Sequence, residues 1–337
     1  MKFHIYFIFY LLYVNCYKII TNPKQNTYKF NGNFFWKIGK SKNYKKGNLH
    51  RTLFNDYPIC IYRDKNSHIN AISDICIHRG ASLSYGKLLD NNCLQCPYHG
   101  WEYDTKGKLV KVPSAHNIPI GGDIGSYSVI EDGGFIWTAK KSQPLPTRYC
   151  KELTDPGWVH VYGSKELKGN IYDWILNATD ISHINYVHNF ADENNGIVKN
   201  IKVETIDDYV DCFAIVQPKA SSTFTEHMQP KSGAPVHSRF VSPATSIVRI
   251  KLAGKYEFIT FSTLAPIDDV HTKMSWCMMY PKTPLMNNPI VNKRFHDKMY
   301  ETVAQDEAII KEIEWVPMFV NAPCDKFQIE ALKLLEK

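Results

Sequence analysis

Hydrophobic and polar residues follow one pattern in the first part of the chain and a different one in the second. Up to about residue 138, short runs of β-branched and aromatic residues alternate with turn-forming residues, which is typical of a small all-β domain. Residues 140–149 contain two prolines and few apolar side chains, so we interpret them as a linker. The runs expected to form strands are 58–64, 69–76, 109–113 and 133–139.

The second part combines strand-like and helix-like patterns. Alternation of apolar and polar residues returns between residues 201 and 281, and helical patterns cover 172–189 and 288–313. We therefore expect an α+β fold, with an antiparallel sheet and a long C-terminal helix. Together the patterns predict an all-β domain over 30–142 and an α+β domain over 150–337. The expected strands of the second domain are 209–216, 245–252, 256–265 and 273–280.

The first 22 residues fit neither pattern. Residues 3–14 are apolar except for His4, and a lysine precedes them. This apolar run is shorter than the roughly 20 residues that a membrane-spanning helix needs. We interpret residues 1–22 as a targeting leader or short membrane anchor, with an apolar element packed on the domain as the alternative.

Charge and cysteine content narrow the class of protein. The formal net charge is +7, and residues 37–51 contain several Lys and Arg but no acidic residue. This segment is either a solvated basic loop or a docking surface for an acidic electron-transfer partner. No basic–aromatic pattern indicates nucleic acid. The nine cysteines do not have the spacing of a disulfide scaffold, which favours a reducing intracellular compartment, either the cytosol or an organelle.

Two short segments, CIHRG and CPYHGW, carry the strongest chemical signal. Each offers one thiol and one imidazole, Cys76 with His78 and Cys96 with His99. Zinc sites with two Cys and two His usually group like ligands together. The mixed grouping instead suits a [2Fe–2S] cluster in which one iron takes both thiolates and the other takes both imidazoles.

Zinc stays open as an alternative because of a further cysteine. Cys93 and Cys96 have the spacing of a zinc knuckle. The other interpretation makes Cys93 a small buried residue near the turn.

A second possible metal site lies in the sequence NATDISHINYVHNF. Asp180 and His183 are three residues apart and share a face of the expected helix, whereas His183 and His188 are five apart. The two histidines can therefore meet at one metal only if the helix ends or bulges between them. The alternative is a surface helix with two incidental histidines.

A carboxylate that could complete this site lies on the C-terminal helix. Asp306 shares an apolar stripe with Met299, Val303, Ile310 and Ile313. A carboxylate that faces a core must be paired, neutralised or bound to a metal. Two histidines and one carboxylate form the triad that holds ferrous iron with open positions for O₂.

Both segments resemble those of Rieske non-haem iron oxygenases, within the group of single-chain monooxygenases and demethylases. The stretch from DICIHRG to CPYHGWEYD is similar to the loops of a Rieske domain, and Asn177, Asp180, His183 and His188 match the family pattern N-x-x-D-x-x-H-x-x-x-x-H. The sequence AQDEAIIKEIE resembles the segment with the third ligand, Asp306. The resemblance implies a helix-grip catalytic domain after the Rieske domain. It also implies a Rieske [2Fe–2S] cluster and a mononuclear Fe(II), with Asn177 and Asp180 in catalytic roles.

The same resemblance implies an activity and partners. The expected enzyme uses O₂ and electrons from a separate ferredoxin or flavin-type reductase to hydroxylate or oxidatively demethylate an apolar, aromatic or cyclic organic molecule. Family members form rings, usually homotrimers, in which Asp180 would connect His99 of a neighbouring subunit to His183. The alternatives are a ring-hydroxylating dioxygenase and a Rieske electron carrier with an inactive second domain.

The sequence does not identify substrate contacts. A group of large side chains in the sheet region could line a pocket, although we expect most of them to belong to the core. These residues are Phe240, Phe258, Phe261, Trp276 and Met278.

Overall fold

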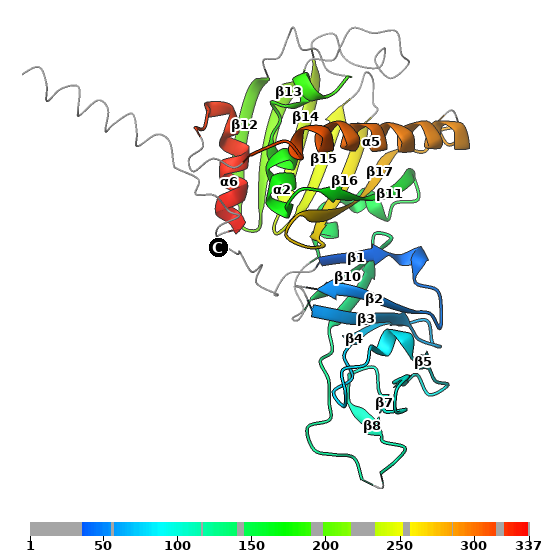
Figure 1. Ribbon diagram of the computed structural model, residues 1–337. Coiled ribbons are helices and arrows are strands. Elements are labelled where there is room, and N and C mark those ends of the chain that lie inside the picture. Colours follow the sequence, from blue (N-terminus) through cyan, green and yellow to red (C-terminus); the bar gives the residue numbers. More distant parts are fainter. Residues whose placement is uncertain are drawn as a thin grey trace, which may run out of the picture. The chain divides into compact units, whose positions relative to one another are not determined.

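The computed structural model (Figure 1) forms two compact units, which we describe separately. One unit is Lys29–Asp155 with Ala265–Asp268, and the other contains Pro156–Leu264 and Asp269–Lys337. The domain limits expected from the sequence stay predictions, and the possible leader lies outside the described residues. None of the described helices is long and apolar enough to cross a membrane. The structure describes residues 36–54, 57–115, 117–139, 145–189, 198–216, 233–251, 257–284, 286–314 and 320–335.

The N-terminal unit is an all-β domain, as the short apolar runs predict, and its strands form three small antiparallel sheets. Their strand orders are β1-β10-β9, β2-β3-β4 and β5-β6-β7-β8. Four 3₁₀ turns connect or follow them: η1 (Ser41–Asn43), η2 (Leu83–Tyr85), η3 (Pro146–Tyr149) and η4 (Lys151–Leu153). The strands are β1 (Trp36–Lys40), β2 (Leu49–Phe54), β3 (Tyr57–Arg63), β4 (Ile69–Ser73), β5 (Lys87–Leu88), β6 (Leu94–Gln95), β7 (Glu102–Tyr103), β8 (Leu109–Lys111), β9 (Ser128–Asp132) and β10 (Phe135–Ala139).

The core of this unit supports the two cysteine-containing segments. Tyr62, Leu94 and Tyr103 are fully buried, and Cys76 and Cys96 pack in the same cluster. Strand β4 ends at Ser73, shortly before Cys76, and β6 ends at Gln95, directly before Cys96. Each cysteine therefore begins its loop from a position that is already buried in the core.

The basic segment 37–51 is not simply a solvated loop. It forms β1, η1 and the start of β2. Lys37 is buried, with its ammonium group 5.7 Å from the centre of the Phe135 ring, whereas Lys42, Lys45 and Lys46 are exposed. The exposed lysines are the part of the segment that a partner could contact.

The C-terminal unit is built on one seven-stranded antiparallel sheet, in the order β11-β17-β16-β15-β14-β13-β12. Figure 1 shows helices α2, α5 and α6 lying across one face of this sheet. The strands are β11 (Trp158–Lys168), β12 (Lys199–Ile206), β13 (Tyr209–Val216), β14 (Ala234–Val241), β15 (Thr245–Lys251), β16 (Glu257–Pro266) and β17 (His271–Pro281). The helices are α2 (Ile171–Thr179), α3 (Ile184–Val187), α5 (Pro289–Ile310) and α6 (Lys326–Leu335), with a 3₁₀ turn η6 (Pro323–Asp325).

Two elements of this unit, α6 and the edge strand β11, lie outside the ranges that the sequence predicts as strand or helix. The apolar signal of β11 is weak because Gly163 and several charged residues interrupt it. Gly163 pairs with Trp276 on β17, and a Cβ atom at position 163 would lie 2.1 Å from the Trp276 ring. The glycine that weakens the pattern is therefore required by the packing.

The helix expected over 172–189 is wrong in one respect, because it is broken. A capping box formed by Asn170 and Asp173 starts α2, and the helix ends at Thr179. Asp180 adopts an extended conformation, and only the short α3 follows. Asp180 and His183 consequently do not share a helix face. The sequence analysis nevertheless required such a break if His183 and His188 were to bind the same metal.

Two candidate metal centres

The segments CIHRG and CPYHGW form the same loop twice. In each loop the cysteine amide donates to the carbonyl five residues later, and the following glycine amide donates back to the cysteine carbonyl. Gly80 and Gly100 have φ values of 74° and 72°, a conformation that favours glycine. The bonds are Cys76 N to Ala81 O (2.9 Å), Gly80 N to Cys76 O (2.9 Å), Cys96 N to Trp101 O (2.8 Å) and Gly100 N to Cys96 O (3.1 Å).

The repeated loop places like ligands together. The Cys76 and Cys96 thiols are buried and close enough to hydrogen-bond, and the Tyr103 hydroxyl lies 3.2 Å from Cys76 Sγ. The His78 and His99 rings lie side by side, with centroids 4.5 Å apart. The two thiols thus form one pair and the two imidazoles another.

This arrangement fits a Rieske-type [2Fe–2S] cluster. Nδ1 of His78 is buried and has no hydrogen-bond partner among the described residues, so it needs another ligand. Burial raises the pKa of the Cys96 thiol, and an iron centre would offset that effect by stabilising the thiolate. The ring of Trp101 stacks on His78 with an interplanar angle of 3°, which holds the imidazole in place.

Cys93 is 7% exposed, and burial raises the pKa of its thiol. This is the behaviour expected of a small buried residue.

The second centre is assembled around the break after α2. The carboxylate of Asp180 accepts a hydrogen bond from Ser182 N (2.6 Å), which closes the turn. His183 stands immediately before α3 and His188 immediately after it. The single turn of α3 therefore brings both imidazoles to the same side.

Helix α5 brings the carboxylate to this place. The Tyr300 hydroxyl donates to Ser164 O (2.8 Å), and Glu307 accepts from Lys165 Nζ (2.6 Å) and Lys168 N (2.9 Å). These bonds fix α5 on β11. The neighbouring Asp306 is only 7% exposed and points the other way, towards the histidines.

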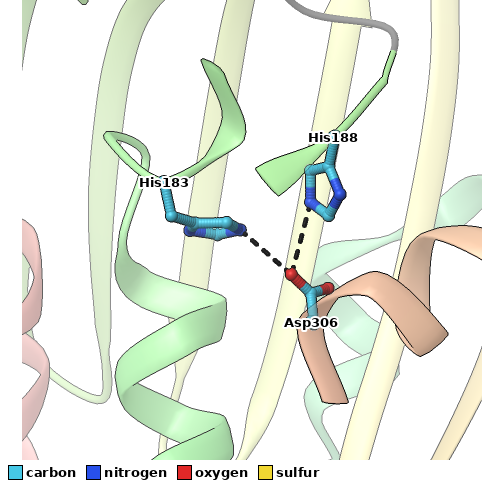
Figure 2. Close-up of side chains that lie close together, drawn as sticks. All are labelled: His183, His188 and Asp306. Atoms are coloured by element: carbon cyan, nitrogen blue, oxygen red, sulfur yellow. Dashed lines mark ion pairs between the residues drawn. The ribbon is translucent and has the colours of Figure 1, made fainter. Parts of the chain in front are cut away.

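Figure 2 shows the three side chains converging. Asp306 Oδ1 lies 3.4 Å from His183 Nε2 and 3.4 Å from His188 Nε2. One donor atom from each of the three residues lies within 4.8 Å of the others. Two imidazole nitrogens and one carboxylate at this separation suit a 2-His-1-carboxylate iron site.

Neighbouring side chains orient these ligands. Asn177 Nδ2 donates to Asp306 Oδ1 (3.3 Å), and His188 Nδ1 donates to Gln305 Oε1 (3.1 Å), which leaves Nε2 of His188 directed at the site. Sequence reasoning did not find Gln305, because a glutamine beside a ligand carries no distinctive signal. Burial lowers the pKa of His188 and outweighs the Asp306 carboxylate, so the ring is neutral, as a metal ligand must be.

Asp180 lies beside this site. Its Oδ2 is 3.9 Å from His183 Nδ1, which is too long for a hydrogen bond. His183 Nδ1 is buried and has no hydrogen-bond partner among the described residues. A small movement of either side chain would connect them.

The histidines open into a cavity of about 240 Å³ between the helices and the sheet. Of the five large side chains considered from the sequence, Phe240 lines this cavity. Phe261, Trp276 and Met278 are buried in the core, as expected, and Phe258 stacks on Tyr280 and Phe295.

Comparison with known families gives two matches along the chain. The model for the Rieske [2Fe-2S] domain matches residues 34–127. The model for the vanillate O-demethylase oxygenase C-terminal domain matches residues 173–337. Both sets of candidate ligands lie within these matches.

Curated relatives and solved structures agree with the two family models. The chain is 30% identical to cholesterol 7-desaturase nvd of Bombyx mori over 39% of this chain and 29% of that protein. It is 35% identical to the oxygenase component of dicamba O-demethylase of Stenotrophomonas maltophilia, over 42% of each chain. The matched regions thus span less than half of these relatives. The structure of Pseudomonas putida CBB5 NdmA with caffeine has the same fold, with a TM-score of 0.77, 20% identity and coverage of 94% of this chain and 92% of that one.

Proposed function

Since the chain joins a Rieske [2Fe-2S] domain to a vanillate O-demethylase-type oxygenase domain, and so belongs to the Rieske non-haem iron oxygenases, we propose that it is a terminal oxygenase. The proposed reaction is the O₂-dependent hydroxylation or oxidative demethylation of a small organic substrate. The observation that carries the proposal is the convergence of His183, His188 and Asp306 beside a cavity that both histidines line. An electron carrier has no need of this second centre.

Each residue has a defined task in this mechanism. Cys76 and Cys96 would hold one iron of the cluster, and His78 and His99 the other. His183, His188 and Asp306 would hold the mononuclear iron. When bound, the cluster supplies single electrons and the mononuclear iron supplies open positions for O₂.

The protein fixes and shields these groups. Asn177 holds the Asp306 carboxylate and Gln305 holds the His188 ring, so that the ligands are oriented before the substrate enters. The apolar walls of the cavity exclude water from the reacting substrate.

Electron delivery involves partners. A ferredoxin or flavin-type reductase would reduce the cluster, and the exposed lysines of segment 37–51 would attract its acidic surface. In a homotrimer, Asp180 would connect His99 of one subunit to His183 of the next. The position of Asp180 beside the unpaired Nδ1 of His183 supports this role. A reducing compartment would keep the thiols available for iron.

Three alternatives, namely a Rieske carrier, a zinc site and a dioxygenase, are distinguished by iron content, the paramagnetic signal and the product. An oxygenase should contain about three irons per chain, two in the cluster and one at the triad, whereas a Rieske carrier should contain about two. The reduced protein should give the paramagnetic signal of a [2Fe–2S] cluster, which zinc at this site cannot give. A dioxygenase would be recognised by a product with two adjacent hydroxyl groups. Two irons per chain, after anaerobic addition of ferrous iron, would contradict the proposal.

A further inference from the structure

The floor of the cavity is formed by one face of the sheet, and its side chains are uncharged. Successive inward-facing residues of β14 and β15 are Val236, Ser238, Phe240, Ser246 and Val248, and all of them line the cavity. Alternation along each strand sends the residues between them to the opposite face. A molecule in the cavity would therefore contact a surface that the strand register defines.

Hydroxyl groups lie on three neighbouring strands of this apolar floor. Ser246 pairs with Ser262 across β15 and β16. Ser238 on β14 lies opposite Val248, the next inward-facing residue of β15 after Ser246. Thr260 adds a fourth hydroxyl from β16. Small hydroxyl side chains in an otherwise apolar wall are the polar groups that fix a ligand's orientation.

The charged groups at the cavity all belong to the iron site. Among the described lining residues, the ionisable side chains are Asp180, His183 and His188. Ferrous iron at the triad would add two positive charges, and the carboxylates of Asp306 and Asp180 would balance them. The cavity then has no surplus cation to offset the cost of burying an anion. An uncharged molecule does not have this cost.

We infer that the cavity binds an uncharged, mainly apolar molecule whose single hydroxyl or carbonyl group is held by the serine hydroxyls of the floor, chiefly Ser238 and Ser246. This inference rests on the proposed function and names its substrate class. A cavity of about 150 Å³ already accommodates benzene. The 240 Å³ found here therefore accepts one ring with small substituents.

Three probes of the same shape test the charge preference. The compounds para-anisyl alcohol, para-anisate and para-methylanisole share a ring and a methyl ether and differ only in the group opposite the ether. Their dissociation constants should be measured by calorimetry on the full chain with its iron content determined. We expect the alcohol to bind at least about tenfold more tightly than the anion. Equal or tighter binding of the anion, or no binding of the alcohol, would overturn the inference.

Serine variants test the subsite. In Ser238→Ala and Ser246→Ala the alcohol should bind roughly three- to tenfold more weakly, because it loses a hydrogen bond. Binding of para-methylanisole should stay the same. Thr245→Val is the matched control, since Thr245 precedes Ser246 on β15 and faces the other side of the sheet. Equal losses for all three variants would refute the subsite.

The binding experiments can fail while the proposed function holds, because the two are decided by different measurements. Iron content and the cluster signal decide whether the protein is an oxygenase. The ranking of the three probes decides what its cavity accepts. A protein with three irons that prefers the anion would keep the function and exclude the substrate class.

Discussion

The two candidate metal centres are built in opposite ways. The cluster ligands come from two copies of one short loop, each closed by the same backbone hydrogen bonds and each ending in a glycine with positive φ. The triad is assembled from distant parts of the chain, since His188 and Asp306 are 118 residues apart. A local loop carries its geometry in its own sequence. A distant assembly depends on the elements that bring its parts together.

This contrast predicts that the two centres fail independently. Asp306→Ala should abolish O₂-dependent product formation and lower the iron content from about three to about two per chain, because one of three ligands is lost. The cluster should keep its absorbance and paramagnetic signal. Asp297→Ala, an exposed carboxylate on the same helix, is the control and should keep all the iron. Loss of the cluster in Asp306→Ala would show that the centres are structurally coupled.

A second variant examines the connection between the centres. Asp180→Asn keeps the size of the side chain and should leave both metals bound. The rate at which O₂ reoxidises the reduced cluster should fall about a hundredfold, in line with the larger losses found when residues around metal ligands are changed. Asp269→Asn, on the exposed surface of the same unit, provides the comparison. A normal rate in Asp180→Asn would remove Asp180 from the electron path.

The contrast also explains what the sequence could predict. The cluster loops were predictable because Cys, His and Gly recur at short spacing. Asp306 was predictable from an amphipathic stripe, in which Val303 and Ile310 are indeed buried while Ile313 is 46% exposed beyond the helix end. The sequence showed only that the helix must break if both histidines are to bind one metal, and it did not show where. An Asp side chain can close a turn or lie within a helix, and the local sequence does not decide between the two. Strand β11 and residue Gln305 were missed because their roles depend on partners far away in sequence, Trp276 and His188.

The distant assembly should depend on its supporting side chains. Gln305→Leu removes the acceptor for His188 Nδ1, so the ring can rotate away from the iron. We expect the affinity for ferrous iron to fall about tenfold, measured by competition with a chelator. Gln305→Glu keeps an acceptor and should restore most of the affinity. If both variants bound iron normally, the backbone alone would fix His188.

Removing a supporting side chain near the cluster loops should change the reduction potential of the cluster and leave its iron content unchanged. Tyr103 is fully buried, and its hydroxyl contacts Cys76 Sγ, so it can donate a hydrogen bond that stabilises the extra negative charge of the reduced cluster. Tyr103→Phe should keep the iron and lower the reduction potential by about 60 mV, which corresponds to about 1.4 kcal/mol for one electron. Tyr85→Phe, at an exposed site in the same unit, should leave the potential unchanged. An unchanged potential in Tyr103→Phe would mean that the backbone of the loop, without this hydroxyl, sets the properties of the cluster.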